Sequence, residues 1–573
     1  MGAMRSAAAL LLLPLALAAA CSREPAPKAP AQAAHVPLAE LPAVEAARLL
    51  EQTRALSSDE FQGRKPGTEG ETRTVAYLEA QFKALGLQPG NTDGTYVQDV
   101  RLVGLTPSQQ RPLTVTGAGK TTTFAWRDEV VAWSKHVADQ ASLENSEMVF
   151  VGYGVTAPEF DWNDFKDLDV KGKTLVVLVN DPQVPSASDA SVLDEKVFGG
   201  RAMTYYGRWT YKYEEAARRG AAGVLIVHET GPAGYPFSVV QGNLGERLDL
   251  VTEDKNMGRA SVEGWLSLDA ARKLMTMAGQ DLDALKAQAL TRDFTPVPLG
   301  VTASMAISTK IRTMGSKNVL AKLEGSDPAL KDEYVVYTAH WDHFGVGEPV
   351  DGDTIYNGAL DNASGSAMVL EIARAFTQVT PKPKRSMLFL MVTAEEQGLL
   401  GSASYAEYPI YPLAKTVAVV NIDGINQWGR TKDLTVVGLG ASQLDDYLRE
   451  AATEQGRTLR PDPESEKGYY YRSDHFNFAK KGVPALYTDT GIEYVGKDAT
   501  YGTQKRDEYT SRDYHSPSDE VKDDWDLTGA VEDARLLMAV GYRVANAATW
   551  PEWAPGNEFR AAREQMLGRS ARP

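Results

Sequence analysis

Apolar residues recur at helical spacing near the start of the chain and at strand spacing farther on. The helical spacing predicts helices over residues 41–56 and 72–85, and Gly86 stands where a glycine closes the second helix. The pattern then changes to short alternating runs, such as Leu113–Val115 and Thr121–Trp126, which indicate strands. The amino-terminal part is therefore expected to pass from helices into β-structure.

Between about residues 148 and 290, apolar β-runs are separated by Gly and Pro and by a helix near residues 211–219. This texture predicts an independent β-rich inserted domain. From Asn318 onward the order becomes strand, loop, helix, repeated. Alternation of this kind predicts an α/β fold, a mostly parallel mixed sheet with helices on both faces. The expected strands are 334–339, 386–393, 416–422 and 483–487, and the expected helices are 363–376 and 527–546.

The first residues have the pattern of an export signal. Arg5 precedes the apolar run Ala7–Ala20, which is too short to span a membrane and ends directly before Cys21. This resembles a bacterial lipoprotein signal, in which the cysteine is lipidated, and Ser22 favours sorting to the outer membrane. Simple secretion is the alternative. We expect an exported protein, in the periplasm or at the cell surface, that touches the membrane only through a lipid anchor at Cys21.

Composition narrows the function. The chain has 60 Lys and Arg against 76 Asp and Glu, a net charge of −16, which argues against nucleic acid as a partner. A single cysteine excludes a disulfide framework and a multi-cysteine metal site. The Gly-Lys-Thr triplets at 119–121 and 172–174 lack the earlier glycine of a phosphate-binding loop and are expected to be hairpin turns.

Histidines and acids follow the ends of the predicted strands in the second half of the chain. Carboxyl ends of parallel strands meet at one edge of a sheet, so these segments are expected to converge on one pocket. The residues are His340, Asp342, Asp361, Glu395, Glu396, Asp423 and His515.

Two histidines and three carboxylates suit zinc but exceed the needs of one four-coordinate ion. If one carboxylate bridges, five residues can serve two ions about 3.5–4 Å apart, with a water between them as the nucleophile. Of the neighbours Glu395 and Glu396, one can bind metal while the other acts as general base. Asp342 is placed to accept the second ring N–H of His340.

These segments resemble the co-catalytic dizinc aminopeptidases, metallopeptidase family twenty-eight, over most of the chain from about Leu56. The resemblance implies two Zn²⁺ per chain. It assigns His340 and Asp423 to one ion, and it assigns Glu396 and His515 to the other.

The resemblance also implies that Asp361 bridges the two ions and that Glu395 is the general base. Asp342 would stand behind the first histidine, and Tyr514 would hydrogen-bond the tetrahedral intermediate. His343 is expected to play a supporting part. The residues expected near the substrate are Tyr471, Arg472 and His475.

The function expected from this resemblance is removal of N-terminal residues from peptides that have a free N-terminus. Glu395 would take a proton from the water and pass it to the leaving amine. A carboxypeptidase or a glutaminyl cyclase on the same fold is an alternative, although a carboxypeptidase needs several basic residues and Arg472 is one candidate. A non-catalytic binding protein is a further alternative.

The chain is thereby divided into five segments. The inserted one resembles a protease-associated domain. The segments are a signal peptide (1–21), a Pro/Ala-rich tether (22–40), the first part of the peptidase domain (41–135), the insert (136–292) and the second part with the metal site (293–573).

Overall fold

The computed structural model describes residues 36–569, apart from residues 167 and 243. The predicted signal peptide, Cys21 and most of the tether lie outside this range, so the lipid anchor stays a prediction. Within the described part of the chain, no helix is both long and apolar enough to cross a membrane.

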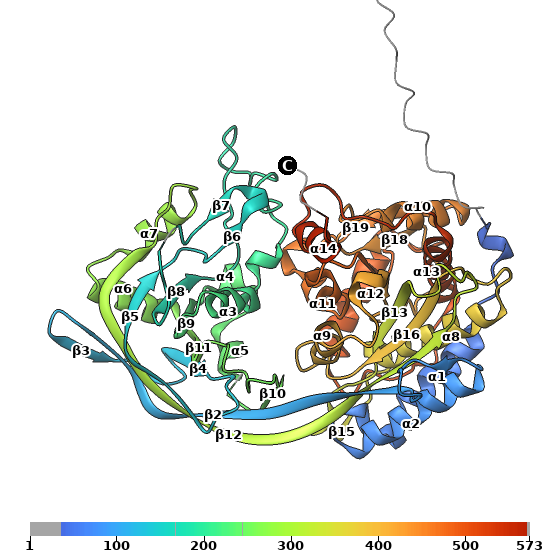
Figure 1. The fold of residues 1–573 in the computed structure, drawn as a ribbon, viewed down its shortest axis with the longest axis horizontal. Coiled ribbons are helices and arrows are strands. Elements are labelled where there is room, and N and C mark those ends of the chain that lie inside the picture. The colour runs from blue at the N-terminus through green and yellow to red at the C-terminus, as the bar shows by residue number, and fades with distance from the viewer. Residues whose placement is uncertain (1–35, 167, 243, 570–573) are drawn as a thin grey trace, which may run out of the picture.

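Two lobes are joined by a pair of long antiparallel strands, β2 (Val97–Gly117) and β12 (Val297–Leu323), as Figure 1 shows. Their ladder begins where Val97 pairs with Val319 and continues, with local bulges, almost to the end of β2. We call the lobe with α1, α2 and residues 318–569 the larger lobe, and the other the inserted lobe. A single sheet therefore extends through both lobes.

The larger lobe has the α/β architecture that the sequence predicts. Three central strands are buried at every position, which explains their unbroken apolar runs. Neighbours are parallel in the centre, whereas β12 runs antiparallel to β16 and β18 runs antiparallel to β20, so the sheet is mixed. The strands in spatial order are β19 (Thr458–Pro461), β18 (Asp433–Val436), β20 (Ala485–Asp489), β17 (Thr416–Asn421), β13 (Tyr334–His340), β16 (Ser386–Val392) and β12.

Helices cover both faces of this sheet. Alternate residues of β13 point to opposite faces of the sheet. Val335 belongs to the core on the face covered by five helices, and Val336 belongs to the core on the face covered by two helices. Gly86 follows α2 with φ of +70° and ends the helix, as expected. One face carries α1 (Ala46–Leu56), α2 (Glu69–Ala84), α8 (Gly365–Gln378), α10 (Leu444–Glu454) and α13 (Thr528–Asn546); the other carries α9 (Leu400–Glu407) and α11 (His475–Lys480).

The inserted lobe has its own core on both faces of a five-strand region. Side chains such as Leu113, Phe124 and Ile307 belong to this core, although they lie outside residues 136–292. Its identity as a protease-associated domain stays a prediction. The main elements are β5 (Gln140–Phe150), β8 (Thr174–Leu178), β9 (Gly223–Val227), β11 (Val262–Leu266), β4 (Val130–Trp133), α3 (Trp209–Arg218) and α6 (Leu268–Met277).

The two Gly-Lys-Thr triplets lie in different turns. Gly119 sits between the paired strands β2 and β3 (Lys120–Thr123), so the first triplet forms the expected hairpin turn. The second triplet leads into β8, whose neighbouring strands both run parallel to it, so no hairpin forms there and that prediction is wrong.

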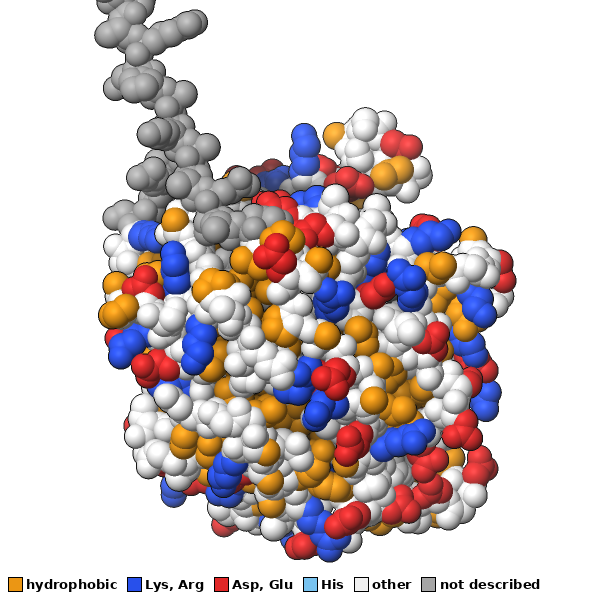
Figure 2. All heavy atoms as spheres, turned by 90° about the vertical axis from the view of Figure 1, so that its right-hand side faces the viewer, with side chains coloured by type: hydrophobic (Ala, Val, Ile, Leu, Met, Phe, Trp, Pro, Cys, Tyr) orange, Lys and Arg blue, Asp and Glu red, His pale blue; other side chains and the backbone are white. Residues whose placement is uncertain are grey.

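On the face of the larger lobe shown in Figure 2, basic side chains are scattered among acidic and apolar ones.

Candidate active site

Two clusters of metal-binding side chains share one carboxylate at the edge of the sheet. His340 Nε2 lies 3.1 Å from Asp423 Oδ1 and 3.2 Å from Asp361 Oδ1. On the other side, His515 Nε2 lies 3.2 Å from Asp361 Oδ2 and 3.3 Å from Glu396 Oε2. The two oxygens of Asp361 thus face different histidines, as a bridging ligand requires.

Strand ends place most of these side chains. His340 is the last residue of β13, Glu395 and Glu396 follow β16, and Asp423 follows β17 by two residues. The three strands are parallel neighbours and end at the same edge. Asp361 lies in the turn before α8, so segments that are distant in sequence meet at one point.

Burial and neighbouring charges shift the pKa values of the carboxyl groups in this centre. The pKa of Glu396 is well above its usual range because of burial and of the nearby charges of Asp361 and Glu395. Burial would raise the pKa of Asp361 as well, but hydrogen bonds from His340 and His515 hold it well below its usual range. The carboxylates of Asp361, Glu395, Glu396 and Asp423 outnumber the imidazoles of His340 and His515. The site therefore has an excess of negative charge, which bound cations would neutralise.

Neighbouring groups orient the ligands. His343 Nδ1 lies 2.5 Å from Glu396 Oε1, which fits the supporting part expected of this histidine. His340 Nδ1 lies 3.2 Å from the backbone carbonyl of Asp342 and 3.7 Å from that residue's carboxylate. The carbonyl is therefore the closer acceptor, and it leaves Nε2 free for a metal. The Asp342 carboxylate accepts the backbone N–H of Glu395 at 3.0 Å.

Three further hydrogen bonds fix the acid-bearing loops. Asn362 Oδ1 accepts the backbone N–H groups of Gly365 and Gly424, both at 2.9 Å, and so ties the start of α8 to the Asp423 loop. The Ser473 hydroxyl donates to the second carboxylate oxygen of Asp423. These contacts explain why polar residues without catalytic chemistry surround the site.

Arg64 is a supporting residue that sequence reasoning did not find. Its buried guanidinium donates to the backbone carbonyls of Leu56 at 2.7 Å, Trp341 at 2.8 Å, Asn357 at 2.6 Å and Gly358 at 2.8 Å. It thereby links the loops on either side of the metal ligands. No local pattern marks this arginine, because three of its four backbone partners lie almost 300 residues away.

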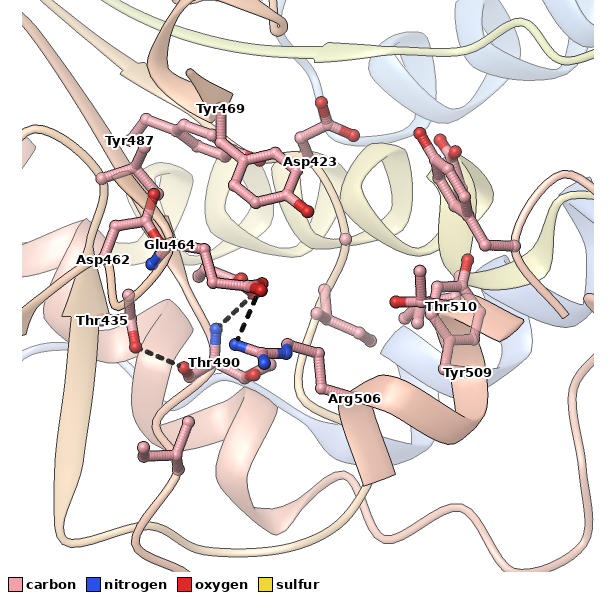
Figure 3. Close-up of a pocket in the computed structure, with 18 of the residues that line it drawn as sticks. Asp423, Thr435, Asp462, Glu464, Tyr469, Tyr487, Thr490, Arg506, Tyr509 and Thr510 are labelled. Carbon is pink, nitrogen blue, oxygen red and sulfur yellow. Dashed lines mark hydrogen bonds and ion pairs between the residues drawn. The ribbon is translucent and has the colours of Figure 1, made fainter. Parts of the chain in front are cut away.

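A cavity of about 440 Å³ opens beside the centre. The residues that line it include the acids Glu395, Asp361 and Asp423 and also Tyr514 and Arg472. Tyr469 and Glu464 face Arg506 and Tyr509 across this space, and Arg506 forms an ion pair with Glu464 at 3.5 Å (Figure 3). The Tyr514 ring stacks on His515 with centroids 3.7 Å apart.

Two residues expected near the substrate lie behind the cavity wall instead. Tyr471 is buried and donates its hydroxyl to Glu558 at 2.7 Å. His475 is fully buried between the rings of Tyr470 and Tyr487, and burial lowers its pKa to about 3. Neither lines the cavity. Of the three residues expected near the substrate, Arg472 alone does so.

The donor set fits zinc. Two imidazole nitrogens and the acids are of the kinds that zinc accepts, and no thiolate is needed. Ligating atoms of His340, Asp361 and Glu396 lie within 4.8 Å of one another, as do those of His340, Glu395 and Asp423. Both groups contain His340, and Asp361 also lies 3.2 Å from His515, so the set could hold two ions that share Asp361.

The mixed α/β sheet and the chemistry of this site agree with the zinc-peptidase resemblance that the sequence suggests. Residues 318–539, which are 222 of the 573 residues, match the family model described as "Peptidase family M28". The predicted family resemblance is confirmed there.

Relatives share only parts of the chain. The mouse (Mus musculus) protein named "Aminopeptidase NAALADL1" is 33% identical over 132 residues, 22% of this chain and 16% of its own. The Caenorhabditis elegans "Glutamate carboxypeptidase 2 homolog" is 24% identical over 311 residues, 49% of this chain and 37% of its own. The chain thus spans well under half the length of either curated relative.

Among solved structures, the aminopeptidase from Aneurinibacillus sp. strain AM-1 has a TM-score of 0.44 and 19% identity. It matches over 87% of this chain and 93% of its own.

Proposed function

We propose that the protein is a two-zinc aminopeptidase. The observation that carries this proposal is the position of Asp361, whose two oxygens each lie 3.2 Å from a different histidine. His340 and Asp423 would hold one ion, and Glu396 and His515 the other, with Asp361 between them. The family match over residues 318–539 supports hydrolysis of peptide bonds.

Glu395 has the position of a proton carrier. Its carboxylate lines the cavity, and within the described residues no group donates a hydrogen bond to it, so it is free to face a water. Bound zinc would supply Lewis acidity and lower the pKa of a water. Glu395 takes a proton from the attacking water and returns it to the leaving amine. Tyr514, at the cavity wall, would donate a hydrogen bond to the carbonyl oxygen under attack.

The test is an assay of protein lacking residues 1–21 on aminoacyl amides and on the same peptides with blocked N-termini. We expect cleavage of the free-amine substrates alone, lost with chelator and restored by zinc. Cleavage of blocked peptides from the C-terminus would favour the carboxypeptidase alternative. A zinc-loaded protein that cuts neither set would contradict both.

Two proposals concern the rest of the chain. Residues 1–21 would act as a lipoprotein signal that anchors the enzyme through Cys21 in the outer membrane. Incorporation of labelled palmitate, lost in Cys21→Ala, tests this. The inserted lobe would be a protease-associated domain.

A further inference from the structure

Part of the cavity wall is a segment with little secondary structure of its own. Residues 464–472, which we call the wall segment, form two short 3₁₀ turns, Ser465–Lys467 and Tyr469–Tyr471, on either side of Gly468. The backbone hydrogen bonds within it reach only three residues back, at 2.8–3.2 Å. Its position therefore depends on contacts with other parts of the chain. The side chains of the wall segment that line the cavity are Glu464, Lys467, Tyr469 and Arg472.

One contact on the wall segment comes from the inserted lobe. The backbone N–H of Met203 donates to the carbonyl of Ser465 at 3.1 Å. Among the described residues, this is the only backbone hydrogen bond that joins the wall segment to a distant part of the chain. The Met203 side chain also lies against Gly468, where an added Cβ would come 2.6 Å from the Met203 sulfur. The inserted lobe thus supports the turn at the middle of the wall segment.

Tyr205 makes a second contact, on the side of the wall segment away from the cavity. Its ring lies 5.2 Å from that of Phe476 and 6.4 Å from that of Tyr471. Both belong to a cluster of buried rings on which the cavity-lining Tyr469 and Tyr487 also pack. In the described part of the inserted lobe, Tyr205 is the only hydrophobic residue packed on this cluster. The buried rings, which we call the aromatic cluster, are Tyr470, Tyr471, Phe476, Trp553 and Phe559.

Glu558 joins the same two parts of the molecule. One of its carboxylate oxygens accepts the backbone N–H of Tyr205 at 3.2 Å, and the other accepts the hydroxyl of Tyr471 at 2.7 Å. The described residues that line the cavity all come from the larger lobe. The inserted lobe therefore reaches a molecule in this cavity through the wall segment and not by direct contact.

We propose that Tyr205 is a substrate-positioning residue, which completes the aromatic cluster and so holds the wall segment where its side chains meet the peptide. The inference rests on the proposed function and gives the inserted lobe a part in substrate binding. Without the Tyr205 ring, the wall segment keeps its local turns but loses support, and a peptide must order it on binding. The proposed zinc ligands and Glu395 lie on other segments, so this cost falls on binding and not on the chemical step.

The experiment measures steady-state cleavage of Leu-Gly-Gly by zinc-loaded protein lacking residues 1–21. We expect Tyr205→Ala to raise KM about three- to tenfold and to leave kcat within about twofold, because weaker binding without altered chemistry raises KM alone. Tyr205→Phe keeps the ring and loses only the hydroxyl contact with Glu214 on α3, so it should keep KM. The matched control is Phe160→Ala, which removes another half-buried ring whose aromatic partners, Phe198 and Tyr206, lie in the inserted lobe. It should also keep KM.

Hydrogen–deuterium exchange of residues 465–472 tests the support of the wall segment without any activity. We expect faster exchange there in Tyr205→Ala than in the unaltered protein or in Phe160→Ala. If Tyr205→Ala does not fold, Tyr205→Leu takes its place, since it keeps apolar bulk but loses the ring contacts.

Three kinetic results would each overturn the inference: an unchanged KM in the Tyr205 variant, an equal rise of KM in Phe160→Ala, or a loss confined to kcat. If the unaltered protein cuts no peptide, the proposed function fails. Exchange then decides the support by Tyr205 alone, and equal exchange of residues 465–472 in the variant and the unaltered protein overturns it.

Discussion

Arg64 Nε donates a hydrogen bond of 2.8 Å to the carbonyl oxygen of Trp341, the residue that follows the ligand His340. The same guanidinium binds the carbonyls of Asn357 and Gly358, just before the loop of Asp361. One side chain from the amino-terminal segment therefore fixes the spacing of two ligand loops.

Arg64→Lys should weaken zinc binding about 10- to 100-fold, because a lysine amine cannot satisfy four separated carbonyls and the loops lose their spacing. We also expect the free energy of unfolding to fall by about 1–3 kcal/mol, since buried carbonyls are left unpaired. Zinc titration and urea unfolding measure the two effects. Unchanged affinity would show that the loops keep their positions without Arg64. Arg54→Lys, on an exposed face of α1, serves as control.

Glu395→Gln should retain two zinc ions and lose about 10²- to 10⁴-fold in kcat, because the amide cannot accept the proton of the water. Metal content by elemental analysis and steady-state rates test this together. Glu348→Gln, at an exposed position of β14 (Gly345–Val350), is the control. Near-normal kcat in the zinc-replete Glu395 variant would remove Glu395 from the mechanism.

Gly365→Ala should damage the site although no ligand is changed. A Cβ there would lie 2.1 Å from Asn362 Oδ1 and 2.7 Å from the carbonyl of Ile422, so the link between the two acid loops must shift. We expect a loss of about 1–3 kcal/mol in the free energy of unfolding and weaker zinc binding. Gly231→Ala, where a Cβ meets nothing within 4 Å, should have neither effect. Equal behaviour of the two variants would contradict the packing argument.

Glu558 makes stability depend on pH at the contact between the lobes. Burial, followed by the nearby charges of Glu159 and Asp181, raises its pKa from 4.5 to about 8. The pKa of Glu558 is higher in the folded state than in the unfolded state, so the protonated carboxyl stabilises the fold. This stabilisation is complete below about pH 4.5 and is lost as the pH rises toward 8. Glu558→Gln should reduce the decline in unfolding free energy between pH 5 and pH 8, measured in urea. A decline as steep as in the unaltered protein would refute this assignment.

Much of the larger lobe and the candidate ligands followed from the rule that parallel strands end at one edge. Buried strands such as Tyr334–His340 are short and almost wholly apolar, so their ends are visible in the sequence and the acids after them stand out. Imidazole nitrogen and carboxylate oxygen are ligands that zinc accepts, so the residue types alone favoured zinc as the metal.

Other features depended on contacts that no local pattern contains. A run of three tyrosines is compatible with a pocket wall or with a core, and only packing shows that Tyr471 is buried against Glu558 while Tyr469 lines the cavity. The full length of β2 and β12 was hidden because polar stretches interrupt their apolar alternation.

The continuity of β2 and β12 has a thermodynamic consequence. Each lobe forms its core on residues of the same two strands, with Val319 in one core and Ile307 in the other. Loss of either core would leave its stretch of the shared ladder exposed to water. The lobes should therefore lose their structure together, in one cooperative heat-absorption peak, and scanning calorimetry that resolved two independent peaks would contradict this coupling.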